Sequence, residues 1–147
     1  MRPSDLDGVM AIEEVSFPTP WSRAMFIEDF PRSFSDTLVA AGTDDEVLGY
    51  AVCWTIAGES HLLNIAVHPE RRGRGVGRAL LSECIRRAAL AGASLIYLEV
   101  RAGNEAAQRL YLSMGFAFRG IRKGYYTDTA EDAVVFDREV RKSDAAR

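Results

Sequence analysis

Apolar positions recur along this chain with two periods, and each period predicts one kind of element. An apolar residue at every third or fourth position is typical of a half-buried helix, whereas short, dense apolar runs are typical of strands. The first pattern predicts helices near residues 6–15, 23–30, 76–90 and 105–114. The second predicts strands within residues 37–57, 61–67, 94–100, 116–126 and 131–140, and the first of these segments reads as a hairpin around a Gly/Asp turn.

Particular residues mark where these helices begin and end. The stretch "SDLD", Ser4–Asp7, fits a capping box, and Ser22 and Asn104 are the predicted N-caps of the second and last helices. Gly92 and Gly115 follow the third and last helices, where glycine readily ends a helix. The order of helices, antiparallel strands and then alternating strands and helices predicts a mixed α/β domain built on one sheet.

Composition bounds the class of protein. The chain of 147 residues is long enough for one domain, which we place at residues 1–147 with 141–147 as a flexible tail. No apolar run approaches the ~18 residues of a membrane span and no signal-peptide pattern is present, so we expect a cytoplasmic protein without a membrane partner. The formal net charge of -3 argues against general nucleic-acid binding.

The segment "RRGRGVGR", residues 71–78, is a basic exception within this acidic chain. It separates an apolar strand from a helix. A helix N-terminus offers N–H groups to an anion, glycines let the backbone come close, and arginines add charge-assisted contacts. Phosphate binding is therefore favoured over a flexible turn with solvated arginines, although the spacing fits neither a P-loop nor a dinucleotide fingerprint. The expected phosphate contacts are Arg72, Gly73, Arg74, Gly75, Val76, Gly77 and Arg78.

The same segment carries a family resemblance. Arg72, Gly75 and Gly77 stand in the pattern Arg/Gln-x-x-Gly-x-Gly/Ala, which resembles the pyrophosphate loop of the Gcn5-related N-acetyltransferases (GNAT). The stretch "NEAAQRLYLSMGF" resembles a second motif of that superfamily. The resemblance extends from about Leu6 to Val135 and implies the GNAT fold: one central, mostly antiparallel sheet, helices on both faces, and a splayed pair of strands at the acetyl-CoA site.

This resemblance also implies how acetyl-CoA would be held. The loop would bind its diphosphate, and the strand "NIAV" would present Ile65, Ala66 and Val67 to the pantetheine arm. Asn104 matches a residue that contacts pantetheine, and Tyr111 matches one that approaches the thiol. Acetyl-CoA is thus the expected co-substrate, and no metal is implied.

Several blocks together resemble a narrower group. "FPTPWS", "LLNIAVHPERRGRGVGRALL", "LEVRAGNEAAQRLYLSMGF" and "YYTDTAEDAVV" are similar to the bacterial ribosomal-protein-alanine N-acetyltransferases. The implied acceptor is the α-amine of a protein N-terminus, with the alanine of a small-subunit ribosomal protein as the leading candidate. One departure is that only "MRP" precedes the first helix, so either the family's first strand is reduced or the chain start differs.

Acetyl transfer to an amine needs a proton acceptor and a donor for the departing thiolate. Glu99 interrupts the apolar strand "IYLEVR", and the resemblance puts the proton acceptor there; the alternative is a strand-end carboxylate paired with Arg101. Glu59 is a rival that we expect at a solvated turn. Tyr111 is the predicted acid, and its alternative is a core aromatic on an amphipathic helix.

Aromatic residues in two loops are candidates for gripping a peptide. Trp21, Tyr125 and Tyr126 are expected at the substrate, although core or hairpin packing explains each of them equally well. Glu131 and Asp132 would face a positively charged N-terminus, unless they lie at a solvated turn.

The sequence offers no sign of metal or covalent-intermediate chemistry. His61 and His68 form no constellation with a nucleophile or ligand set, and we interpret both as structural. We interpret Cys53 and Cys84 as buried free thiols, which are typical of a reducing compartment. Neither lies at a position that matches a catalytic residue of the family. Direct attack of the amine on the thioester is the expected mechanism.

Two other functions stay open. One is an acetyltransferase for a small amine, such as a polyamine or an aminoglycoside, for which an open acidic cleft would be typical. The other is a catalytically silent acyl-CoA-binding module, against which the presence of both Glu99 and Tyr111 speaks. The sequence predicts no oligomeric state.

Overall fold

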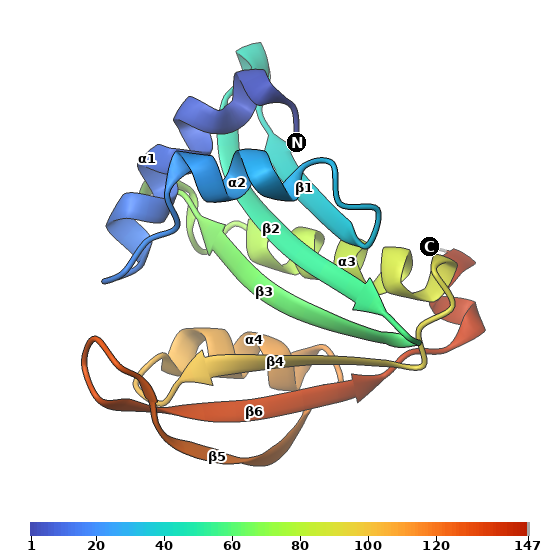
Figure 1. Ribbon diagram of the computed structural model, residues 1–147. Helices are drawn as coiled ribbons and strands as arrows, with labels where there is room; N and C mark the ends of the chain where they lie inside the picture. Colours follow the sequence, from blue (N-terminus) through green and yellow to red (C-terminus); the bar gives the residue numbers. More distant parts are fainter. Residues whose placement is uncertain (147) are drawn as a thin grey trace. The chain divides into compact units, whose positions relative to one another are not determined.

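A computed structural model describes residues 1–146, and within them six strands form one sheet of order β1-β2-β3-β4-β6-β5 (Figure 1). The α-helices are α1 (Leu6–Ser16), α2 (Arg23–Asp29), α3 (Val76–Leu90) and α4 (Glu105–Ser113). The strands are β1 (Ser35–Ala41), β2 (Val47–Ile56), β3 (Glu59–Val67), β4 (Leu95–Arg101), β5 (Ala117–Tyr126) and β6 (Glu131–Glu139). The predicted mixed α/β class is confirmed.

Contacts divide the chain into two compact units. Unit 1 comprises residues 1–54 and 63–84, and unit 2 comprises residues 55–62 together with the chain from Ile85 onward. The boundary passes through β2, β3 and α3, so each of these elements contributes to both units.

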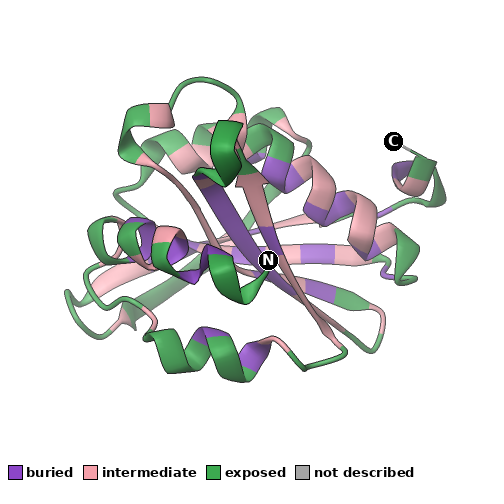
Figure 2. Ribbon diagram, turned by 90° about the horizontal axis from the view of Figure 1, so that it is seen from above, coloured by how far each residue is buried: buried purple, intermediate pink, exposed green. Residues whose placement is uncertain are grey.

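The core of unit 1 lies between α1, α2 and β2. Leu6, Val9 and Ile12 follow helical spacing on α1, and they are buried with Phe26 of α2. Val47, Tyr50 and Val52 of β2 complete this cluster. Gly8 allows the close approach of α1, because a Cβ at this position would lie 2.7 Å from Cγ2 of Val47. Figure 2 shows buried residues alternating with exposed ones along the helices.

Hydrogen bonds at the helix ends show which of the predicted N-caps form. Oγ of Ser22 accepts a hydrogen bond from the backbone N–H of Met25, as predicted. The capping box at Ser4–Asp7 is wrong, because a 3-10 turn over Pro3–Asp5 precedes α1. Its Asp5 carboxylate accepts from the N–H of Arg2 at 2.7 Å, so the acidic residue caps the turn and not the α-helix.

Unit 2 is built on the antiparallel strands β4, β6 and β5. Burial alternates along β4, where Ile96, Leu98 and Val100 are buried and the residues between them are half-buried. The helix α4 packs on the buried face, with the ring of Tyr111 6.1 Å from that of Phe136. One face of the strand therefore belongs to the core, and the other carries polar side chains.

The start of β3 belongs to unit 2 and pairs with β4 in parallel. The register joins Glu59–Leu62 to Leu95–Leu98, and His61 lies opposite Tyr97. This pairing ends at Leu62 although β3 continues to Val67.

The two ends of the chain are held by polar contacts. No strand precedes α1 in the part that the structure describes, and the amino group of Met1 donates to the carbonyl of Thr37 at 2.8 Å. Near the other end, residues 142–146 form a 3-10 turn in which Asp144 is buried and accepts from Arg138 at 3.0 Å. These residues fall in the expected flexible tail, whose last residue, Arg147, lies outside the described residues. No helix in residues 1–146 is long and apolar enough to cross a bilayer.

Candidate functional site

The glycine loop between β3 and α3 has a backbone that only glycine adopts easily. Gly73 and Gly75 have φ angles of +76° and +83°, in the left-handed region. No atom lies within 4 Å of a Cβ built on either residue, so their conformation and not crowding requires glycine. The carbonyl of Gly75 accepts from the N–H of Ala79 at 3.0 Å, which begins the helix. The N–H groups of the first turn of α3 therefore follow directly on the glycines.

Side chains tie this loop to the end of β3. Nε of Arg72 donates to the carbonyl of Val67 at 3.2 Å, and Arg71 pairs with Glu46 at 3.0 Å. Nδ1 of His68 accepts from the N–H of Glu70 and caps a short turn, which confirms its structural role. Arginine cations beside a glycine backbone and a helix N-terminus suit a pyrophosphate. The loop residues named from the sequence thus fit a diphosphate, and their contacts with one stay a prediction.

The polar face of β4 carries Glu99 in a closely held position. Oε2 of Glu99 lies 2.6 Å from Nε2 of His61, and Oε1 lies 3.9 Å from a guanidinium nitrogen of Arg122. Burial alone raises the pKa of Glu99, but the hydrogen bond and charge of His61 and the charge of Arg122 outweigh it and lower the pKa below its ordinary value. Glu99 is therefore ionised at neutral pH.

This arrangement corrects two interpretations. Glu99 is not paired with Arg101, the alternative considered for it, and His61 is not isolated. Register explains the contact of His61, which lies opposite Tyr97 and so falls on the same face as Glu99, two residues further along β4. The guanidinium of Arg101 is instead held by Asp128 and Glu131. Glu59 is exposed at the start of β3, as expected for a solvated position.

Tyr111 lies on the other face of β4. Its side chain is buried, with 4% of the residue exposed, and packs against Phe116 and Phe136. Phe136 pairs across the sheet with Leu98, whose side chain points away from that of Glu99. The two predicted catalytic residues therefore do not meet within unit 2. The structure shows the core packing of Tyr111 that was its alternative role, and its role as an acid stays a prediction.

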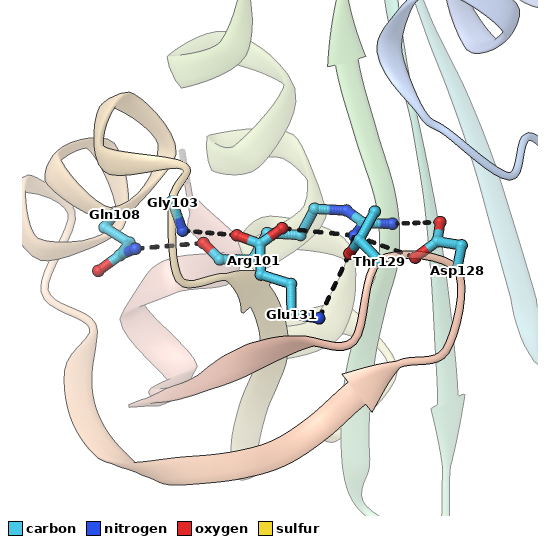
Figure 3. Close-up of polar contacts among 6 residues, drawn as sticks. All are labelled: Arg101, Gly103, Gln108, Asp128, Thr129 and Glu131. Atoms are coloured by element: carbon cyan, nitrogen blue, oxygen red, sulfur yellow. Dashed lines mark hydrogen bonds and ion pairs between the residues drawn. The ribbon is translucent and has the colours of Figure 1, made fainter.

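The hairpin of β5 and β6 is held at its tip by Arg101 (Figure 3). The guanidinium donates to the carboxylate of Asp128 at 2.8 Å and 3.3 Å and to Oγ1 of Thr129 at 3.0 Å. It also approaches Glu131 at 3.5 Å and stacks over the ring of Tyr126 at 4.0 Å. One side chain at the end of β4 thus fixes four residues of the hairpin.

The acidic residues of this hairpin serve its own structure. Glu131 accepts from the N–H of Gly103 at 2.8 Å, next to the start of α4 (Figure 3). Asp132 accepts from the N–H of Gly124 at 2.9 Å and pairs with Lys123 at 3.1 Å. Neither is free to meet a substrate ammonium group without giving up these contacts, and both lie in β6 and not in the solvated turn considered as the alternative.

The three aromatic candidates differ in surroundings. Tyr125 is exposed, and its ring lies 5.1 Å from that of Tyr126. Burial raises the pKa of Tyr126 to about 12, with Arg101 opposing the shift. Trp21 belongs to unit 1, where its ring packs on Phe26 at 5.0 Å. Contact of these residues with a peptide stays a prediction.

Sequence reasoning did not single out Glu13, which organises the segment before α2. The residue is buried on α1 and accepts from the N–H of Trp21 at 2.9 Å, from Asn64 at 3.0 Å and from the hydroxyl of Tyr50. Burial raises its pKa, and these three hydrogen bonds oppose the rise. The sequence did indicate that Glu13 could be buried, because this residue directly follows Ile12 and lies on the apolar side of the helix.

Asn104 has the predicted capping role. Its Oδ1 accepts from the N–H of Ala107 at 3.2 Å at the start of α4, which leaves its amide N–H groups outside the capping bond.

Cys53 and Cys84 are buried free thiols. The hydrogen bond between them is the main cause that raises the pKa of Cys84, and burial of the thiol raises it further. The described residues contain no group of three or more ligand-type side chains placed to hold a metal ion.

Comparison with known proteins places these features in a family. The profile of the Acetyltransferase (GNAT) family matches residues 6–116. A ribosomal protein bS18-alanine N-acetyltransferase of Salmonella typhimurium (strain LT2) is 35% identical over 134 residues, which cover 90% of this chain and 89% of that protein. The crystal structure of the ribosomal-protein-S18-alanine N-acetyltransferase from Escherichia coli superimposes with a TM-score of 0.85 and 32% identity, over 95% of this chain and 90% of that one. The structure of a nourseothricin acetyltransferase matches with a TM-score of 0.69 and 32% identity, over 74% of this chain and 67% of that one.

Proposed function

This chain belongs to the GNAT acetyltransferase family, and we propose that it moves the acetyl group of acetyl-CoA to the α-amine of a protein N-terminus. The leading acceptor is the N-terminal alanine of a small-subunit ribosomal protein. The observation that carries this proposal is similarity along the whole domain, because a bS18-alanine acetyltransferase matches 90% of the chain at 35% identity.

The ionised carboxylate of Glu99 suits an α-amine as acceptor. An α-ammonium group has an ordinary pKa of about 7.7–8.0, against about 10.4 for a lysine side chain, so less base strength is needed near neutral pH. Glu99 supplies the general-base function, and binding geometry supplies much of the rate. Its position on the polar face of β4, where His61 holds it ionised, supports this role.

The chain's own residues would hold the co-substrate along β3 and its following loop. Arg72, Gly73, Gly75 and the first turn of α3 would bind the diphosphate, and Ile65–Val67 would line the pantetheine arm. These three strand residues are half-buried, so each keeps some surface for a ligand. When bound, acetyl-CoA supplies the acetyl thioester.

Tyr111 is proposed to protonate the departing thiolate. Glu99 and Tyr111 occupy opposite faces of β4, so the reacting atoms would have to lie beside the edge of this strand at residues 99–101. The parallel pairing of β4 with β3 has ended before these residues. A base on one face and an acid on the other would then address one thioester from two sides.

A small-amine acceptor is the second candidate. The similarity to a nourseothricin acetyltransferase, at 32% identity over 74% of the chain, favours it specifically. The higher TM-score of the alanine acetyltransferase, 0.85 against 0.69, supports the N-terminal acceptor over this one.

A mass-spectrometric acetylation assay tests the proposal. Acetyl-CoA would be offered with a peptide that begins with alanine, with the same peptide blocked at its N-terminus, and with a polyamine. We expect label on the free alanine amine alone, reduced ~100-fold or more in a Glu99→Gln variant. Glu59→Gln is the matched control, because it removes an exposed carboxylate from the same unit.

Other outcomes of this assay are equally informative. Label on the polyamine alone would move the protein to the small-amine class. Cofactor binding without transfer to any acceptor would overturn the proposal and favour the silent acyl-CoA-binding module.

A further inference from the structure

His61 and Glu99 form a hydrogen-bonded pair that the mechanism above leaves half unused. The imidazole ring of His61 stacks on Tyr97, with centroids 4.4 Å apart and planes 12° apart. This stack fixes the ring so that Nε2 points at Oε2 of Glu99, 2.6 Å away. The pair joins β3 to β4 within their parallel register.

The two members of the pair differ in accessibility. The side chain of Glu99 is 7% exposed, and that of His61 is 24% exposed. Oε2 of Glu99 is occupied by His61, and Arg122 lies 3.9 Å from Oε1. The carboxylate is thus enclosed by its partners, and the imidazole is the member that a substrate reaches more easily.

The charge of Glu99 also decides the tautomer of its partner. A carboxylate that is ionised accepts hydrogen bonds and donates none, so Nε2 of His61 must carry the proton of the shared bond. The lone pair of a neutral ring then lies on Nδ1. A carboxylate that orients an imidazole in this way is the arrangement used where histidine acts as a base.

We propose that His61, in place of Glu99 itself, takes the proton from the substrate ammonium group at Nδ1. Glu99 orients the ring and stabilises the imidazolium that forms, so that the pair and not the carboxylate alone supplies the general-base function given to Glu99 above. The inference rests on the proposed function. The N–H bond of the ammonium breaks and the Nδ1–H bond forms; the freed amine attacks the thioester carbonyl. The new C–N bond forms as the C–S bond breaks, and the thiolate takes the proton of Tyr111. The second proton, which the nitrogen loses as the amide forms, passes through water to the tyrosinate, and the imidazolium releases its proton to solvent.

The surroundings of the pair bear on its pH dependence. The titratable and charged groups near it are Tyr97 and Glu99 on β4, Arg122 and Tyr125 on β5, and Glu59 on β3. Two of these groups, Glu59 and Glu99, are carboxylates, and Arg122 is a cation. The exposed position of Glu59 leaves Glu99 as the main partner.

Rates of the His61 variants provide the first test. His61→Gln and His61→Phe both remove the base, and the second keeps an aromatic ring to stack on Tyr97. At pH 7 we expect kcat/KM for an alanine peptide to fall ~100-fold in both, with the KM for acetyl-CoA unchanged. The loss should shrink at pH 9, where an α-amine with an ordinary pKa of about 8 is already neutral. A purely structural role would give a loss that does not depend on pH.

The ring nitrogens provide a second test that does not need activity. The chain has two histidines, so 15N spectra of the full chain separate His61 from His68, which serves as an internal reference. At neutral pH we expect His61 with a protonated Nε2 and an unprotonated Nδ1, and loss of this preference in Glu99→Ala with His68 unchanged. A protonated Nδ1 on a neutral His61 ring in the wild-type protein would overturn the proposal.

The two tests separate this inference from the proposed function. Full activity of both His61 variants, with Glu99→Gln inactive, would show that Glu99 takes the proton alone and would overturn the pair. If the wild-type protein acetylates no amine, the proposed function fails, and the nitrogen spectra still decide whether Nδ1 is available to accept a proton.

Discussion

The guanidinium of Arg101 and the carboxylate of Asp128 are joined by two hydrogen bonds, of 2.8 Å and 3.3 Å, across 27 residues of chain. Both side chains are 20% exposed, so water screens this pair less than a surface ion pair. The bidentate contact holds the tip of the hairpin that presents Tyr125 and Tyr126.

Arg101→Lys should loosen this hairpin, because lysine keeps the charge and loses the planar fork. We expect a loss of about 2 kcal/mol in the free energy of unfolding, measured by urea denaturation. The KM for peptide should rise more than kcat falls. Arg119→Lys is the control, since the Arg119 side chain is 59% exposed and its pair with Asp137 should be worth little. An equal effect of both substitutions would contradict the role of Arg101.

Gly75→Ala should strain the loop before α3. Space for a Cβ is open, so the expected cost of about 1 kcal/mol comes from the positive φ alone. Gly120→Ala is the matched control, because its site is also open and its φ is not in the left-handed region. Calorimetric titration with CoA should show weakened binding for Gly75→Ala only. Unchanged CoA affinity would remove this loop from the cofactor site.

Two substitutions of Asn104 separate its capping role from a ligand contact. Asn104→Ala removes the cap and should cost about 1 kcal/mol in stability. Asn104→Asp keeps an oxygen for the N–H of Ala107 and should preserve the stability, but it loses the amide donors. A KM for acetyl-CoA that rises in both variants would indicate a pantetheine contact. A rise in the alanine variant alone would leave only the cap.

Tyr111→Phe tests the proposed acid with little change in packing. The phenyl ring keeps the contacts with Phe116 and Phe136, so the melting temperature should stay within a few degrees of the wild type. We expect kcat to fall ~100-fold if the hydroxyl protonates the thiolate. Wild-type kcat in a folded Tyr111→Phe protein would assign this tyrosine to the core alone.

The stability of the protein should depend on pH through Glu13. Burial raises the pKa of Glu13 in the folded state above 4.5, so the folded protein holds a proton over an interval in which the unfolded chain has lost it. This contribution is complete below pH 4.5 and decreases by about 1.4 kcal/mol per pH unit until the raised pKa is passed.

Glu13→Gln should remove that slope. The difference in unfolding free energy between wild type and variant should therefore fall as pH rises from 4.5 and then become constant. Glu14→Gln changes the exposed neighbour and should keep the wild-type slope. Chemical denaturation across this pH range measures both, and parallel curves for wild type and Glu13→Gln would contradict the assignment.

Much of the fold was predictable because its signals are local. The bounds of α3 follow from apolar spacing and match residues 76–90, and Ser22 and Asn104 cap helices through residues three positions away. The first helix begins at Leu6 as predicted, and only its capping box is wrong, because Pro3, with its fixed φ, begins a 3-10 turn ahead of the helix.

The sequence by itself determined the elements, the glycine loop and the family, since each depends on neighbouring residues or on motif spacing. Tertiary structure decided the partners of the charged groups. Glu99 meets His61 across 38 residues, and Glu13 meets Asn64 across 51. Such pairs depend on strand register and helix placement, which a periodic pattern does not specify. For that reason the sequence suggests that His61 is isolated, whereas in the fold it is the partner of a buried carboxylate.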